Sequence, residues 1–283
     1  MRILCIGGST TVSFPYTPDA DDAWPAKLGN FIAEQNGIEV EEINAGLNGA
    51  NSADLLAHYM FRNRHQKAHI VVIHVGGNDA WALLFPNYNS EYTHFTTGWK
   101  NIALAPRPFE RVLLRNHIAR CAYAWWLKDV TLDADLGRGN IPDLPAADCM
   151  KNAQTNDHSG FRHNLDALVR NIIQDGAIPV IFPFVRAPDE IFRRQYKDYA
   201  DSILLSYKKE LLVMEEISQK YNIKLTSLPE GAIPKDMFKD WCHVNSGGEE
   251  IKAKHLAQAI NPIVRKMIDQ GKFVSTNTIA PAR

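Results

Sequence analysis

The 283-residue sequence lacks several features that would assign it to a common class of protein. Its 31 Lys and Arg against 32 Asp and Glu leave a net charge of −1, and no basic stripe predicts nucleic-acid binding. No apolar run approaches the roughly 18 residues of a membrane-spanning helix, and no basic, apolar N-terminal signal peptide is visible. The four cysteines contain no C-x-x-C pair, which favours reduced thiols and a cytoplasmic location.

What the sequence does contain is an alternation of apolar strand patterns and helical patterns. We expect five strands, at Arg2–Ile6, Ile38–Ile43, Ile70–Val75, Ile178–Phe182 and Ile223–Thr226. We expect helices at Asp22–Gln35, Ser52–Arg64, Phe161–Gln174, about Asp189–Lys220 and Glu249–Ile268. Such alternation predicts an α/β fold, with a parallel sheet covered by helices on both faces.

A long segment at about 80–158 interrupts this alternation. It is rich in aromatic residues and in arginine, and a connection of this length is typical of a lid or an inserted subdomain. We therefore expect one domain over 1–275 with a lid-like insertion at about 80–158, followed by a loose tail at 276–283. The aromatic residues could equally form a small core of the insertion itself.

The stretch Ile3–Thr11, ILCIGGSTT, places a serine directly after the first expected strand. Active sites of open parallel sheets lie beyond the carboxyl ends of the strands, so Ser9 is a candidate nucleophile. The glycine spacing does not fit G-x-G-x-x-G, and the P-loop lysine is missing. The G-x-S-x-G elbow of α/β-hydrolases is missing too. Taken alone, an ordinary turn would also explain the stretch.

Two further candidates follow the next strands. Gly46 comes after the strand that ends near Ile43, and Asn78 follows Val75 in the stretch GGNDAW. Because the ends of parallel strands share one edge of the sheet, we expect both residues to lie near Ser9. A glycine N–H and an asparagine amide are suitable donors to an oxyanion, although Gly and Asn are also common in turns.

The stretch DWCHVNSGG, residues 240–248, supplies a carboxylate and an imidazole three residues apart. If it forms one turn, Asp240 can fix the tautomer of His243, whose other nitrogen would face Ser9. The alternative is a surface loop with a helix cap at Asn245 or Ser246.

Together, the four motifs in this order resemble the SGNH (GDSL-like) hydrolase family. The resemblance implies a three-layer α/β/α, flavodoxin-like sheet of about five parallel strands and metal-free hydrolysis of acyl esters. By resemblance, Ser9, Asp240 and His243 form the catalytic triad, and Ser9, Gly46 and Asn78 the oxyanion hole. One departure is Gly8, where the family usually has aspartate before the serine; it puts the subfamily in doubt more than the mechanism.

The sequence leaves several alternatives open. The leading hypothesis is a serine esterase that removes a short acyl group, in particular acetyl, from a small molecule or a carbohydrate, without a cofactor. An acyltransferase with the same triad, or an inactive binding protein, are the alternatives. The clustered His65, His69 and His74 lack further ligands at the spacing of a metal site. We expect Asp79 to cap the helix that follows it, with a contact to substrate as the alternative, and Cys5 and Cys242 to be packing thiols. The oligomeric state cannot be read from the sequence.

Overall fold

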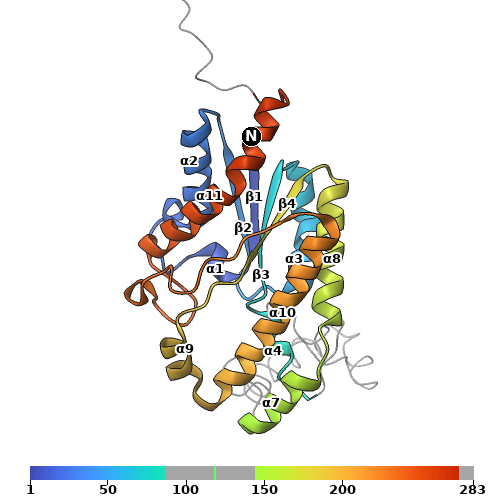
Figure 1. Ribbon diagram of the computed structural model, residues 1–283, viewed down its shortest axis with the longest axis vertical. Helices are drawn as coiled ribbons and strands as arrows, with labels where there is room; N and C mark the ends of the chain where they lie inside the picture. The colour runs from blue at the N-terminus through green and yellow to red at the C-terminus, as the bar shows by residue number, and fades with distance from the viewer. Residues whose placement is uncertain (87–117, 119–143, 274–283) are drawn as a thin grey trace, which may run out of the picture.

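A computed structural model describes residues 1–86, 118 and 144–273. Its centre is a sheet of five parallel strands in the order β2-β1-β3-β4-β5, which confirms the predicted fold class (Figure 1). The strands are β1 (Arg2–Gly7), β2 (Glu41–Gly46), β3 (Ile70–Val75), β4 (Ile178–Pro183) and β5 (Lys224–Leu225).

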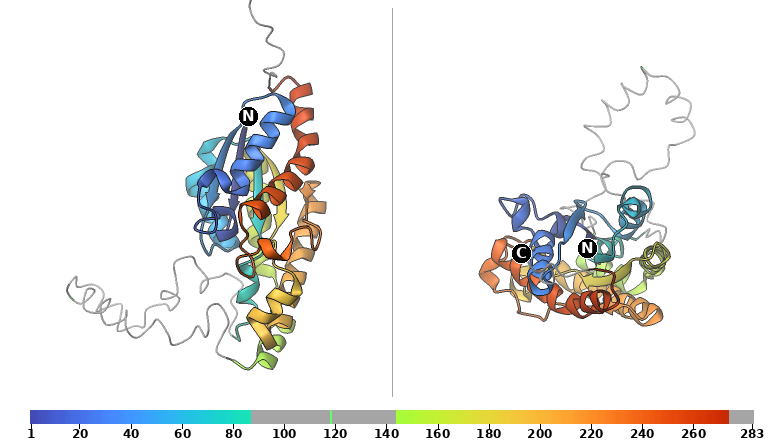
Figure 2. Two further views of the ribbon diagram at one scale, coloured as in Figure 1. Left: turned by 90° about the vertical axis from the view of Figure 1, so that its left-hand side faces the viewer. Right: turned by 90° about the horizontal axis from the view of Figure 1, so that it is seen from above.

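Helices cover both faces of this sheet, and Figure 2 shows the same layers from two further directions. The α-helices are α1 (Ser9–Val12), α2 (Trp24–Asn36), α3 (Ser52–His58), α4 (Asp79–Ala82), α7 (Ala146–Thr155), α8 (Ser159–Gln174), α9 (Asp189–Tyr196), α10 (Ala200–Tyr221) and α11 (Ser246–Asp269). Helices α2 and α11 lie on one face, and α3, α8 and α10 on the other. Helices α4, α7 and α9 lie beyond the carboxyl ends of the strands (Figure 1).

Alternation along the central strands creates the two cores. In β3, Val71 and Ile73 pack with α8, whereas Ile70 and Val72 pack with α2 and α11. All six residues of β3 are buried, as expected of a strand covered on both faces. The central strands are therefore fixed between two apolar cores, one on each face of the sheet.

Two boundaries differ from the sequence-based prediction for physical reasons. The second strand begins at Glu41 instead of Ile38, because Gly37 ends α2 with a left-handed φ of 58° and the chain then packs Ile38 into the core before pairing. The single helix predicted over about 189–220 is two helices, because Lys197 takes a φ of 49° and ends α9.

The helix predicted over Ser52–Arg64 also changes character along its length. It is α-helical only over Ser52–His58, and a π-helical turn, Tyr59–Asn63, and a short 3-10 turn, Arg64–Gln66, follow.

The ends of the predicted insertion lie close together. The Asn152 amide donates to the carbonyl of Leu84, and the Asn156 amide donates to those of Leu83 and Phe85. Most of the predicted lid and the tail at 276–283 fall outside the described residues, so that expectation stays a prediction. In the part of the chain that the structure covers, no helix is long and apolar enough to cross a membrane.

Candidate active site

Three segments that are distant in sequence meet at the carboxyl edge of the sheet. Ser9 is the first residue of α1, directly after β1. Asn78 follows β3, and His243 lies in the loop before α11. The structure thus brings together the residues predicted at this edge.

Ser9, His243 and Asp240 form a hydrogen-bonded chain. The Ser9 Oγ lies 3.0 Å from Nε2 of His243, and His243 Nδ1 lies 2.7 Å from Oδ2 of Asp240. Burial on its own would raise the pKa of Asp240, but hydrogen bonds from His243 and Cys242 outweigh it and bring that pKa to about 2. Because an ionised carboxylate can only accept, Nδ1 is the donor and Nε2 is left to accept the serine proton.

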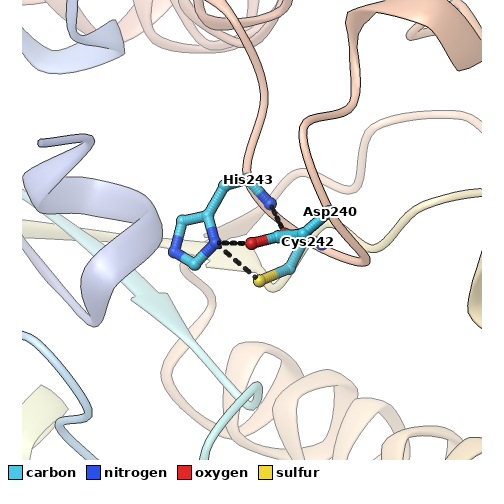
Figure 3. A group of neighbouring side chains, drawn as sticks. All are labelled: Asp240, Cys242 and His243. Atoms are coloured by element: carbon cyan, nitrogen blue, oxygen red, sulfur yellow. Dashed lines mark hydrogen bonds and ion pairs between the residues drawn. The ribbon is translucent and has the colours of Figure 1, made fainter. Parts of the chain in front are cut away.

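The D-x-x-H stretch forms the single turn that its spacing predicts. Oδ1 of Asp240 accepts the backbone N–H groups of Cys242, at 2.8 Å, and of His243, at 2.7 Å (Figure 3). A bridge between Phe238 and Val244 closes the loop behind them. The Asn245 side chain also caps α11 by accepting the Gly248 N–H, so the cap and the turn exist side by side.

Asn78 contributes an amide beside the serine. Its Nδ2 donates to the carbonyl of Ala50 at 2.8 Å. Because an amide carries two N–H bonds, one remains for another acceptor. A Cβ at Gly8 would lie 2.9 Å from this Nδ2, so the residue that departs from the family pattern is the one against which the Asn78 amide rests.

Gly46 takes a different role from the one predicted. It is the last residue of β2, and its N–H donates to Oδ1 of Asn44 at 3.1 Å. A Cβ there would lie 2.6 Å from the backbone N of Val12. Gly46 therefore lets α1, which carries Ser9, approach β2, and its own N–H is already engaged.

Gly49 in the following loop is a further candidate donor, which the sequence-based prediction did not include. Leu47 and Ala50 in this loop donate their N–H groups to backbone carbonyls. Gly49 has a φ of 73°, and a Cβ there would meet nothing within 4 Å. The next residue, Ala50, lines the hollow beside Ser9. The repeated glycine in NAGLNGANS was the signal available, but spacing alone does not say which glycine faces the site.

The hollow beside Ser9 is a small cavity of about 30 Å³. Its walls include Ala50, Gly76, Gly77, Phe184 and Trp241. A single water needs about 10–15 Å³ on this scale, so the cavity holds about two water-sized groups.

Other polar residues near the site have structural roles. Both carboxylate oxygens of Asp79 accept the backbone N–H of Ser52, so Asp79 caps α3, the preceding helix, and not the next helix as predicted. His74 is buried in β3, and its Nδ1 lies 3.0 Å from the carbonyl oxygen of Phe182. Burial, together with the charge of Lys252, lowers its pKa to about 3, so His74 is neutral.

Cys242 lies beside the imidazole, with its Sγ 3.3 Å from His243 Nδ1 (Figure 3). Burial and the charge of Asp240 raise its pKa well above the ordinary value, so the sulfur is a thiol. The ligand atoms of Asp240, Cys242 and His243 lie within 4.8 Å of one another. These atom types suit a metal ion. To bind one, however, His243 Nδ1 and the Cys242 thiol would each first have to lose a proton.

Comparison with known families decides the class of the protein. Residues 5–251 match the profile of the GDSL-like lipase/acylhydrolase family. The chain belongs to this family. As a GDSL-like acylhydrolase it is a carboxylic ester hydrolase. No curated protein sequence matches the chain.

Solved structures share the fold of this GDSL-like hydrolase at low sequence identity. A lipase/acylhydrolase from Enterococcus faecalis is 19% identical, with a TM-score of 0.53 over 98% of this chain and 99% of that one. The acetyl xylan esterase AlAXEase is 14% identical, with a TM-score of 0.53 over 92% of this chain and 100% of that one. An acetylxylan esterase from Geobacillus stearothermophilus is 14% identical, with a TM-score of 0.50 over 92% and 93%.

Proposed function

We propose that this GDSL-like hydrolase cleaves acetyl and other short acyl esters through an acyl-serine intermediate on Ser9. The observation that carries the proposal is the chain of hydrogen bonds from Ser9 through His243 to an ionised Asp240. In this mechanism, the Ser9 oxygen attacks the ester carbonyl while its proton moves to Nε2 of His243. The imidazolium, stabilised by Asp240, then gives that proton to the leaving alcohol.

The second half of the reaction uses the same groups. Water attacks the acyl-serine carbonyl and passes a proton to His243, and the proton returns to Ser9 Oγ as the carboxylic acid leaves. The developing oxyanion is held by the Ser9 N–H, which has no intrahelical partner at the start of α1, and by the free N–H of Asn78. As the third donor we propose Gly49 in place of Gly46, because the Gly46 N–H is engaged by Asn44.

The small cavity beside Ser9 supports the proposal of a short acyl group. The methyl group and the carbonyl oxygen of an acetyl ester are two water-sized groups, which matches about 30 Å³. The acetylxylan esterases of similar fold make an acetylated carbohydrate the first substrate to test. The described residues offer no observation that favours acyl transfer over hydrolysis. We also propose a cytoplasmic location, because Cys5, Cys149 and Cys242 are buried as free thiols.

The test measures hydrolysis of p-nitrophenyl esters from acetate to octanoate, together with acetate release from acetylated xylose. We expect kcat/KM to be highest for acetate, and Ser9→Ala to lose activity by a factor of about 10³ or more. Ser159→Ala is the matched control, because Ser159 starts α8 and its hydroxyl donates to the Asp157 carboxylate. Full activity of Ser9→Ala would refute the mechanism, and a preference for octanoate would refute the short acyl group.

A further inference from the structure

One side chain next to the catalytic histidine has no part in the mechanism so far. The ring of Tyr16 stacks on the imidazole of His243, with 3.8 Å between the ring centroids and 8° between the ring planes. Tyr16 is partly buried. The charge of the nearby Asp240 carboxylate acts on its hydroxyl. Tyr16 thus packs against His243 and lies within electrostatic range of the carboxylate that orients it.

The position of Tyr16 is set by the same segment that presents Ser9. Helix α1 ends at Ser13, whose φ of 63° turns the chain, and the Tyr16 N–H donates to the Ser13 carbonyl at 2.9 Å. The eight residues from Ser9 to Tyr16 therefore carry both the nucleophile and a ring that covers the base. The stack is a consequence of how α1 ends.

We propose that Tyr16 is a positioning residue for His243, which holds the imidazole plane in line with Ser9 and favours its protonated form during the reaction. The proposal rests on the triad proposed above. The hydrogen bonds of His243 to Ser9 and Asp240 hold the imidazole only at its edges, so the ring could still tilt out of line with Ser9. A parallel ring at 3.8 Å restricts that tilt.

The charge on His243 during catalysis gives the stack a second effect. A cation over an aromatic face is attracted to it by about 0.5–1 kcal/mol at partly exposed sites. The other groups that face the imidazole are Ser9, Asp240 and the Cys242 thiol, and Lys252 acts on that thiol through its charge. Burial raises the pKa of Tyr16, and the charge of Asp240 adds to the shift, so the ring is neutral over the working pH range.

The experiment compares Tyr16→Leu, which removes the ring, with Tyr16→Phe, which keeps the ring and removes the hydroxyl. Rates of p-nitrophenyl acetate hydrolysis and of fluorophosphonate labelling are measured from pH 5 to 9. For Tyr16→Leu we expect kcat about tenfold lower at an unchanged KM. We also expect the acid limb of kcat/KM to move about half a pH unit lower, since the imidazolium loses its stabilising ring. Tyr16→Phe should keep the acid limb in place.

Tyr221→Leu is the matched control. Tyr221 is also partly buried and donates its hydroxyl to a carboxylate, that of Asp166, at 3.0 Å, so this variant should leave both rates unchanged. If Tyr16→Leu does not fold by circular dichroism, Tyr16→Met provides the same test. A wild-type kcat and acid limb in a folded variant without the ring overturn the role of Tyr16 alone. Labelling that does not depend on Ser9 overturns the triad and this proposal together.

Discussion

At the scale of single residues, Gly8 has the clearest physical explanation. Its φ of −81° and ψ of −158° are open to any residue, so backbone strain does not demand glycine there. The constraint is the Asn78 amide, which would lie 2.9 Å from an added Cβ. The departure from the usual family aspartate is therefore coupled to the position of Asn78, the proposed oxyanion donor.

Gly8→Ala should lower kcat for p-nitrophenyl acetate about tenfold, because the new methyl group pushes the Asn78 amide away from the oxyanion. Thermal stability should change little. A double-mutant cycle with Asn78→Ala tests whether the effect of Gly8→Ala on kcat acts through the Asn78 amide. If the effect passes through Asn78, Gly8→Ala adds almost nothing in the Asn78→Ala background. The same tenfold loss in both backgrounds would contradict this explanation.

The candidate site could be predicted from the sequence where it depends on strand ends. Ser9, Asn78, Asp240 and His243 follow or precede elements whose patterns are strong, and the topology of a parallel sheet brings them to one edge. The choice between Gly46 and Gly49 could not be predicted, because it depends on which N–H a side chain such as Asn44 already engages. The Tyr16 stack likewise depends on how α1 ends.

At the scale of elements, the fold could be predicted where burial is complete. The strand Ile70–Val75 has the predicted bounds because all six residues are buried. The predicted bounds of the edge strand β2 were shifted by three residues, because its partly exposed residues do not carry an apolar pattern. The break after α9 was missed because it depends on the backbone of Lys197, a residue type common inside helices.

One residue after β4, Phe184, lines two cavities. Phe184 lines both the hollow of about 30 Å³ beside Ser9 and a neighbouring cavity of about 210 Å³. Its ring packs over Gly77, where a Cβ would lie 2.5 Å from Cδ2 of the phenylalanine. If the acyl group of the substrate enters the smaller cavity as proposed, Phe184 separates it from the larger one.

Phe184→Ala should join the two cavities and raise the ratio of hexanoate to acetate kcat/KM about tenfold or more, as each accommodated methylene gains apolar burial. The ester series described above measures this ratio. Leu228→Ala is the control, because Leu228 lines only the larger cavity, and we expect its ratio to stay at the wild-type value. An unchanged ratio in folded Phe184→Ala would show that the acyl chain does not point toward Phe184.

At the scale of the whole molecule, groups whose pKa values are lowered in the folded chain make stability depend on pH in the acid range, and half-buried Asp240 and buried His74 are two of them. Asp240, with a pKa of about 2 against an ordinary value of 3.8, adds stability above about pH 4 that is lost as the pH falls toward 2. His74 acts over a wider range. It lies at the centre of the sheet, stacked on Phe182, and its folded pKa of about 3 is far below the ordinary 6.5.

The free energy of unfolding should therefore fall by the order of a few kcal/mol between about pH 6.5 and 3, because unfolded His74 takes up a proton that the folded chain excludes. His74→Asn keeps a donor for the Phe182 carbonyl but cannot titrate. Urea unfolding at a series of pH values should show that this variant is less stable than wild type at pH 7, because packing is lost. Below pH 6.5, its free energy of unfolding should fall less steeply with decreasing pH than that of wild type. His65→Asn, at an exposed histidine, should keep the wild-type slope. Parallel slopes for His74→Asn and wild type would mean that the sheet opens locally to protonate His74 without global unfolding.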